Sequence, residues 1–429
     1  MTAEAHQGYA IGVDFGTSGV RAIAVDQSGA IAAQSRAAYA AEGAESLAAQ
    51  WQAALATVLL ALPAPLRASV QDIAINGTSA TVLLCDRGGI PLVEPLRYDD
   101  GRAIAQGEAL RAIAPGGSPV LSPTSSLAKL LWWRDTLPPA TWQRAAVLLH
   151  QADWLAYQLH GRLGISDYHN ALKLGYDVGS LAYPDWLQPL EVASRLPQVL
   201  APGAAIAPIT AAAAQRYGLP PTCIIHAGTT DSIAAFLASG ATQPGEAVTS
   251  LGSTLVLKLL STTRVDDSRY GIYSHRLGDR WLVGGASNTG GAVLQQFFST
   301  DDLVRLSRAM QPDQPTGLDY YPLCRPGERF PIADPHLQPR LTPRPADPAQ
   351  FLQGLLEGIA RIEAQGYAHL QTLGATPLSR VWTAGGGAQN TAWTSIRQRL
   401  LGVPVQPAPE TEAAVGTARL ALRSRHRSS

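Results

Sequence analysis

The 429-residue sequence has few cysteines, no excess of charge of either sign and no long apolar run. Its three cysteines, Cys85, Cys223 and Cys324, are far apart and match no metal-binding or redox spacing, which argues against a disulfide-built fold. Lysine plus arginine and aspartate plus glutamate number 33 each, so the formal net charge is zero. The chain therefore lacks the basic surface with which proteins bind nucleic acid or anionic lipid, and we expect neither as a partner.

No segment of the sequence predicts a membrane span or a secretion signal. The apolar run at 58–62 ends at Pro63, well short of the ~20 residues that cross a bilayer. Residues 1–7 have neither the basic region nor the apolar region of a signal peptide. We therefore expect a cytoplasmic protein, and the sequence leaves its oligomeric state open.

Two common nucleotide-binding devices are also absent from the sequence. It contains no G-x-x-x-x-G-K-[ST] loop and no HRD and DFG elements of the protein kinases. If the protein binds a nucleotide, it must do so with loops other than a Walker-type loop or the protein-kinase motifs.

What the sequence does contain is an alternation of short apolar strands and helices. Strands are expected at 9–13, 72–76, 222–226 and 381–384, and each is followed by a turn rich in glycine or hydroxyl residues. Asp347 and Pro348 predict the start of a long amphipathic helix that Gly374 ends. This pattern is typical of an α/β protein.

A short motif occurs once in each half of the chain. Residues 14–18 read DFGTS and residues 250–254 read SLGST, and each lies between two predicted strands. Glycine at such a hairpin tip lets the backbone approach an anion, and successive N–H groups converge on its oxygen atoms. Two such tips predict two lobes that hold a polyphosphate between them.

At these two loops the sequence resembles the FGGY carbohydrate kinases of the actin/Hsp70/hexokinase superfamily. Besides the two phosphate motifs, AGTTD at 227–231 is similar to the segment that carries the family's catalytic aspartate, and AGGGAQN at 384–390 to its adenosine motif. The resemblance runs through essentially the whole chain. It implies two actin-like (ribonuclease H-like) α/β lobes with a central cleft.

The same resemblance implies the domain boundaries. An N-terminal, sugar-binding lobe would cover 8–239, and a C-terminal, ATP-binding lobe would cover 240–410. Residues 411–429 would form a helix that returns to the lobe interface, followed by a frayed tail.

The expected substrate follows from a second resemblance, in which the sequence is similar to one branch of the family: the short cyanobacterial and plant xylulose or ribulose kinases. The segments 76–79, 125–129 and 166–173 are similar to that branch. Ordinary xylulose kinases have Met and His where this chain has Ser79 and Ala80. The resemblance implies transfer of the γ-phosphoryl group of ATP to the terminal 5-hydroxyl of a ketopentose, D-ribulose first and D-xylulose second.

The family motifs imply a role for each of two carboxylates. Asp231 would be the catalytic base, because the N-terminus of the following helix keeps it ionised; an ordinary helix N-cap is the alternative. Asp14 would bind Mg²⁺ through water, accept a sugar hydroxyl, or both; the alternative is a turn-forming aspartate.

The remaining site residues are also implied by the motifs. The expected ATP-binding residues are Gly16, Thr17, Ser18, Gly252, Ser253, Thr254, Gly386, Gly387, Asn390 and Trp393. The expected substrate-binding residues are Asp14, Ser79, Asp100 and Asp231. Packing in the core is the alternative for Trp393, and capping of a loop is the alternative for Asp100.

The sequence allows two other interpretations. A zinc site is not favoured, because the available side chains have no ligand spacing; they are His150, Asp153, His160, Asp167 and His169. An ATP-binding sugar sensor or chaperone-type ATPase would bind the same nucleotide without making a phosphosugar. Such a protein would typically need an added effector domain.

Overall fold

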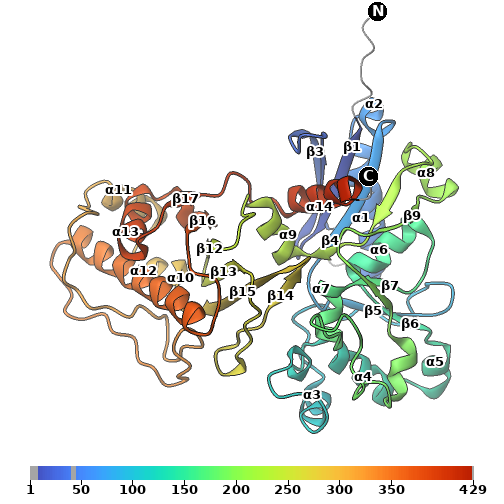
Figure 1. The fold of residues 1–429 in the computed structure, drawn as a ribbon, viewed down its shortest axis with the longest axis horizontal. Helices are drawn as coiled ribbons and strands as arrows, with labels where there is room; N and C mark the ends of the chain where they lie inside the picture. Colours follow the sequence, from blue (N-terminus) through green and yellow to red (C-terminus); the bar gives the residue numbers. More distant parts are fainter. Residues whose placement is uncertain (1–7, 40–44, 428–429) are drawn as a thin grey trace, which may run out of the picture. The chain divides into compact units, whose positions relative to one another are not determined.

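The computed structural model describes residues 8–39 and 45–427, and the chain within it forms two compact units (Figure 1). The first unit takes in Met1–Ala238 and Glu412–Ser429, and the second takes in Ser239–Thr411. Among the described residues, no helix combines the length and the apolar character needed to cross a membrane.

A seven-stranded mixed sheet forms the centre of the first unit. Its order is β3 (Ile31–Ala38), β2 (Gly19–Val25), β1 (Tyr9–Phe15), β4 (Val70–Gly77), β10 (Ile224–His226) and β9 (Ala205–Pro208), with β11 (Thr229–Thr230) also paired to β4. Strand β4 runs parallel to β1, β10 and β11, whereas β1, β2 and β3 form antiparallel hairpins. The carboxyl ends of the parallel strands therefore meet at one edge of the sheet.

Helices cover this sheet with apolar side chains. Helix α1 (Leu47–Ala61) begins at Ser46, whose hydroxyl accepts the Ala49 N–H, and it buries Trp51 and Leu55 in the main core. The other helices near this core are α2 (Ala64–Arg67), α6 (Gln151–His160) and α8 (Ala211–Tyr217).

A second, smaller core lies within the same unit. It packs the antiparallel pair β5 (Val82–Cys85) and β6 (Val147–His150) against α3 (Ile104–Leu110), α4 (Ser126–Thr136) and α5 (Pro139–Arg144). The strands β7 (Ile165–Asp167) and β8 (Gln198–Leu200) pair nearby, and α7 (Tyr168–Ala171) follows β7.

The C-terminal helix α14 (Ala413–Arg427) completes the first unit, although most of that unit lies at the other end of the chain. It packs on β1, β2, β4 and α9 (Asp231–Ala238). Glycine permits this approach at two points: a Cβ at Gly12 would overlap the α14 backbone, and one at Gly416 would overlap the Ala234 carbonyl of α9. In Figure 1 the red helix lies beside the blue strands of this unit.

The second unit has a six-stranded sheet of its own. Its order is β14 (His275–Leu277), β15 (Arg280–Ser287), β13 (Leu255–Ser261), β12 (Glu246–Leu251), β16 (Arg380–Ala384) and β17 (Val405–Pro407). Its helices are α10 (Gly291–Gln295), α11 (Thr300–Ser307), α12 (Pro348–Thr372) and α13 (Thr391–Leu401). Helix α12 starts at Pro348 with Asp347 as its N-cap, which confirms the predicted start.

A buried ion pair joins two helices of the second unit to its sheet. The guanidinium of Arg397 on α13 binds both carboxylate oxygens of Glu363 on α12, at 2.6 and 2.7 Å, and donates to Thr383 on β16. The hydroxyl of Thr249 on β12 donates to the same carboxylate at 2.5 Å. Because β12 and β16 end just beyond this network, it supports the two loops that follow them.

Candidate active site

The candidate site in the first unit is built at the carboxyl ends of three parallel strands. Asp14 near the end of β1 is in register with Asn76 of β4, and Asn76 is in register with Thr229 of β11. Helix α9 begins two residues after Thr229, at Asp231. The strand pairing thus brings the segments of the two predicted carboxylates to one edge of the sheet.

Asp14 and Asp231 interact electrostatically. Burial and the nearby Asp231 carboxylate raise the pKa of Asp14 to about 6, against a smaller opposing effect of Arg21. Its Oδ1 atom is buried and has no hydrogen-bond partner among the described residues. A carboxylate pair with an unpartnered oxygen is a place where a cation or a hydroxyl donor would be stabilised.

This arrangement fits Mg²⁺. Among the described residues, no three His, Cys, Asp or Glu side chains gather to form a cage for a metal ion. Mg²⁺ does not need one, because it keeps several waters and binds through one or two carboxylates together with substrate phosphates. Asp14, with its unpartnered oxygen, meets that requirement.

Asp231 is the first residue of α9, and its Oδ1 accepts the N–H of Ser232 at 2.6 Å. The N-terminus of α9 favours the ionised carboxylate. Lys173 also faces this carboxylate: burial lowers the pKa of Lys173, and Asp231 opposes that shift. Lys173 ends the segment 166–173, but the resemblance gave it no role, because a lysine in a short helical segment carries no positional signal.

The first predicted phosphate loop, residues 16–18, is the tip of the β1–β2 hairpin. The Gly16 N–H donates to Gly19 O at 3.0 Å and closes the tip, while Thr17 and Ser18 are exposed. All three residues line a cavity of about 220 Å³ together with Tyr39, Leu47, Gln50, Trp51, Thr78, Thr81, Arg97, Tyr98 and Gln151. The hydroxyl of Tyr39 donates to Gly16 O at 2.9 Å.

Ser79 and Asp100 lie on two loops of the first unit and do not line this cavity. Both oxygens of Asp100 are bound by Arg102, whose N–H also donates to Oδ1, and this is the loop-capping arrangement. Ser79 is half-buried and precedes Ala80, whose φ of +65° is rare for a residue other than glycine. The buried Lys129 holds both loops, since its ammonium donates to Ala80 O at 2.9 Å and to Arg97 O at 2.6 Å.

The second unit contains a larger cavity, of about 590 Å³. Six predicted residues line it: Gly252, Ser253, Gly386, Gly387, Asn390 and Trp393. Thr254 does not, although its carbonyl accepts the Gly252 N–H at 3.3 Å within the same tip. Helices α10 and α11 also line this cavity, with the apolar side chains of Leu294, Leu303 and Val304 and the polar side chains of Gln295, Thr300 and Ser307. Sequence reasoning missed these side chains, because no motif marks those two helices.

Two glycines allow the loop after β16 to lie against the end of β12. Gly385 has a φ of +84°, and a Cβ there would lie 2.6 Å from the Leu251 carbonyl oxygen. A Cβ at Gly387 would lie 2.7 Å from the Trp393 ring. The phosphate loop and the glycine loop are neighbours in the second unit for this reason.

Asn390 and Trp393 have structural contacts of their own. The Asn390 side chain accepts the Trp393 N–H at 3.0 Å, which caps α13, and donates to Ser307 of α11 at 2.8 Å. Trp393 is 3% exposed and belongs to the core of the unit. Its ring therefore supports the cavity wall, as in the core-packing alternative.

The histidines and aspartates that could suggest a zinc site take part in separate structural contacts. His150 contacts Asp153 at 2.9 Å and Ser126 at 3.0 Å, and His169 contacts Thr229 at 2.7 Å. Asp167 caps α7 by accepting two backbone N–H groups. These contacts use the side chains to join elements of the fold.

Comparison with known proteins assigns both halves of the chain to one family. Residues 9–238 match the N-terminal domain of the FGGY family of carbohydrate kinases, and residues 247–425 match its C-terminal domain. The xylulose kinase of Streptomyces coelicolor is 27% identical over 95% of this chain and 86% of its own length. The L-fuculokinase of Salmonella typhi is 24% identical over 95% of this chain and 90% of its own.

Solved structures show the same fold. The xylulose kinase from Rhodospirillum rubrum has a TM-score of 0.82 and 24% identity, covering 96% of this chain and 89% of that one. The Plasmodium falciparum glycerol kinase with ADP has a TM-score of 0.83 and 16% identity, covering 98% and 90%. At such identities the likeness concerns the fold, and it confirms the predicted α/β, actin-like class.

Proposed function

The chain belongs to the FGGY family of carbohydrate kinases, and from this premise we propose that it phosphorylates the terminal 5-hydroxyl of a ketopentose with ATP. The observation that carries the proposal is the interacting pair of Asp14 and Asp231 at the strand ends of the first unit. Phosphoryl transfer needs a base for the attacking hydroxyl and neutralisation of phosphate charge. This pair, with the loops around it, supplies both.

Asp231 is the proposed catalytic base. Its carboxylate accepts the proton of the sugar hydroxyl while that oxygen forms a bond to the γ-phosphorus. The bond between the γ-phosphorus and the β,γ-bridging oxygen breaks at the same time, so that ADP leaves. The helix N-terminus beneath Asp231 and the ammonium of Lys173 both favour its ionised form.

Asp14 is proposed to contact the sugar and to hold Mg²⁺ through water. When bound, Mg²⁺ neutralises charge on the β- and γ-phosphates. The unpartnered Oδ1 of Asp14 accepts a hydrogen bond from a sugar hydroxyl or from a water of the hydrated ion.

The two glycine-containing tips are proposed to bind phosphates. In the first unit these donors come from Gly16, Thr17 and Ser18, and in the second unit from Gly252, Ser253 and Thr254. We assign adenosine to the cavity of about 590 Å³, where Gly386 and Gly387 allow close approach and α10 and α11 offer the apolar side chains of Leu294, Leu303 and Val304. We assign the sugar to the first unit, with Ser79 as a further contact.

Two ketopentoses are candidate substrates. D-Ribulose is favoured by Ser79 and Ala80, which stand where ordinary xylulose kinases have Met and His. D-Xylulose is favoured by relatives such as the S. coelicolor enzyme, which is named a xylulose kinase.

The deciding experiment measures Mg-ATP-dependent ADP release with D-ribulose, D-xylulose, L-ribulose, glycerol and no sugar. We expect a clear rise with one pentulose, with the phosphosugar detected by mass spectrometry, and loss of that rise in Asp231→Ala. The matched control is Asp267→Ala, because Asp267 is paired with the exposed Arg269 and follows the end of β13, the strand that leads away from the Gly252 tip. ATP binding with a flat response to every sugar would instead favour the sensor or ATPase interpretation.

A further inference from the structure

A buried hydrogen bond ties the C-terminal helix to the strand beside Asp14. The side-chain amide Nδ2 of Asn76 on β4 lies 2.7 Å from the hydroxyl Oγ1 of Thr417 on α14. Both residues have no exposed surface, and 341 positions separate them in the chain. Thr417 belongs to none of the motifs that point to phosphate, sugar or nucleotide, and Asn76 is the first residue of the segment 76–79.

The direction of this bond follows from the other contact of Thr417. A hydroxyl has one proton, and the Thr417 hydroxyl lies 3.0 Å from the Ala413 carbonyl, which accepts that proton. Oγ1 must therefore accept the hydrogen bond from Asn76. This requirement fixes the Asn76 amide group with its NH₂ toward Thr417.

The Asn76 side chain is the neighbour in register of Asp14 on β1, and its amide opposes the rise of the Asp14 pKa. An NH₂ group has two protons: one serves Thr417, and the other is available to the Asp14 carboxylate. With this amide orientation Asn76 presents a donor to the carboxylate, whose Oδ1 has no hydrogen-bond partner among the described residues. A flipped amide would turn an acceptor toward the carboxylate and repel it.

The packing of α14 fixes the position of Thr417 relative to β1 and α9. On one side of Thr417, Gly416 lies against the Ala234 carbonyl of α9, the helix that begins with Asp231. On the other side, Ala418 lies against Gly12 of β1, the strand that carries Asp14. An ion pair between Arg21 of β2 and Glu412 holds the start of the helix.

We propose that Thr417 and Asn76 are positioning residues, which orient the Asp14 carboxylate so that Oδ1 is presented to a hydroxyl of the sugar. This inference rests on the proposed function and adds to it a link from the C-terminal helix to the site. The chemical group that the Asp14 carboxylate would recognise is a hydroxyl donor of a polyol or ketose.

The test compares Thr417→Val, which keeps the shape and removes the hydroxyl, with Thr417→Ser, which keeps the hydroxyl. Calorimetry without nucleotide or metal measures the dissociation constant of whichever pentulose the wild-type protein phosphorylates. We expect this constant to rise about fivefold in Thr417→Val, the effect of one net hydrogen bond, and to return to within twofold of wild type in Thr417→Ser. The kcat/KM for the sugar should follow the same order.

The matched control is Thr57→Val, because Thr57 on α1 makes the same bond to the carbonyl four residues earlier and is exposed. This variant should bind sugar like the wild type. A merely structural role of Thr417 would lower the number of binding sites and the melting temperature and leave the dissociation constant unchanged. If Thr417→Val does not fold, Thr417→Ala is measured with the same expected outcomes.

An unchanged dissociation constant in a folded Thr417→Val protein would overturn the inference. An equal rise in Thr417→Val and Thr417→Ser would overturn it too, because the hydroxyl would then not be responsible. Failure of the proposed function is a separate result: the wild-type protein itself would then show no sugar-dependent ADP release.

Discussion

Asp14 is a carboxylate whose ionisation is opposed by its surroundings. Burial and the charge of Asp231 raise its pKa from near 3.8 to about 6. Ionisation of Asp14 therefore lowers the stability of the folded protein. Such opposition is common where a protein prepares a site for a cation or a hydroxyl donor. It also makes Asp14 testable through stability as well as through activity.

At the residue scale, we predict that Asp14→Asn stabilises the protein and abolishes sugar phosphorylation. The raised pKa means that ionised Asp14 costs stability, so the variant should gain about 1–3 kcal/mol at pH 7.5. Below about pH 3 the wild-type carboxyl is protonated in both the folded and the unfolded state, and the gain should vanish; it should grow as the pH rises from the unfolded pKa of 3.8 through the folded pKa of about 6. Urea unfolding at pH 4, 5, 6 and 7.5 measures it; a gain that does not grow with pH would contradict the prediction.

Lys129 gives a second prediction at this scale. Its ammonium is buried and donates to Ala80 O and Arg97 O, the carbonyls of the two loops that carry Ser79 and Asp100. Lys129→Met removes both bonds and leaves two buried carbonyls, so we expect a loss of about 2–4 kcal/mol. The KM for the sugar should rise more than the KM for ATP, whose proposed adenosine cavity lies in the other unit. Equal changes in both constants would argue against a role in holding the sugar loops.

At the scale of elements, the C-terminal helix depends on glycine. A Cβ at Gly416 would overlap the Ala234 carbonyl, so Gly416→Ala must push α14 away from α9. We expect a loss of about 1–3 kcal/mol in a denaturant titration, together with reduced kcat/KM. The control is Gly116→Ala, where a Cβ would meet no atom within 4 Å, and its stability should change by less than about 0.5 kcal/mol.

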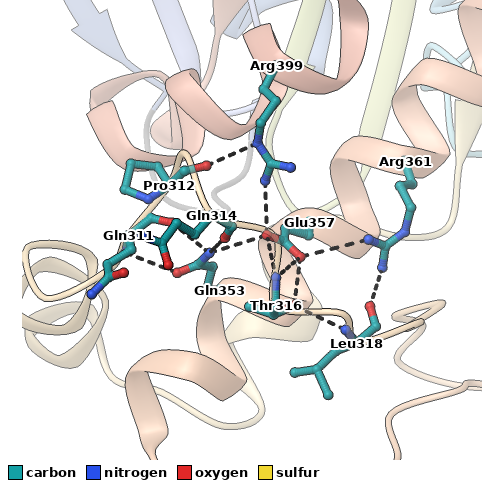
Figure 2. A network of polar contacts seen from close by, with 9 residues as sticks. All are labelled: Gln311, Pro312, Gln314, Thr316, Leu318, Gln353, Glu357, Arg361 and Arg399. Carbon is teal, nitrogen blue, oxygen red and sulfur yellow. Dashed lines mark hydrogen bonds and ion pairs between the residues drawn. The ribbon is translucent and has the colours of Figure 1, made fainter.

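A polar network holds the loop that follows α11 (Figure 2). Glu357 of α12 is 1% exposed and accepts hydrogen bonds from Thr316, at 2.7 Å from its hydroxyl, and from Arg399 at 3.0 Å. Gln353 also bonds this carboxylate and the Gln314 carbonyl, and Arg361 bonds the Leu318 carbonyl. The loop is thereby fixed onto α12 and α13, and α11 before it forms part of the cavity wall.

We predict that Glu357→Ala lowers the free energy of unfolding by about 3–5 kcal/mol, because it leaves Arg399 without its buried carboxylate. The KM for ATP should rise as the wall of the cavity loosens. The control is Glu108→Ala: Glu108 pairs with Arg111 at 3.0 Å, but both side chains are more than half exposed, so the change should stay below about 1 kcal/mol. Equal losses in the two variants would contradict the importance of burial.

At the scale of the whole molecule, one unit is built from two separate segments of the chain, whereas the other is built from a single continuous segment. The first unit needs both ends of the described chain, since α14 covers β1, β4 and α9, whereas the second unit consists of Ser239–Thr411 alone. Burial of Ala414, Val415 and Ala418 against Ala10 and Ile23 adds an apolar core that no other segment provides.

A chain that ends at Thr411 should therefore lose the first unit selectively. We expect limited proteolysis to degrade 8–238 rapidly and to leave a resistant fragment close to 239–411. The full-length chain under the same conditions is the control. Equal resistance of both units in the shortened chain would show that α14 is dispensable for the first unit.

The sequence by itself determined the α/β class, the start of α12 and the membership of a kinase family. These features depend on local chemistry: apolar periodicity, an Asp-Pro helix start, and glycine and hydroxyl residues at two hairpin tips. The resemblance of its motifs to the kinase family also pointed to six residues that the structure places around one cavity: Gly252, Ser253, Gly386, Gly387, Asn390 and Trp393.

Only the tertiary structure decided which partners these residues have. Asn390 caps α13 and Trp393 packs in the core, Asp100 is bound by Arg102, and Lys173 faces Asp231. The pairing of Asn76 with Thr417 crosses 341 residues. No local pattern encodes such a contact, because a buried amide gains its direction from the donors and acceptors that folding brings around it, and those lie in elements distant in the chain.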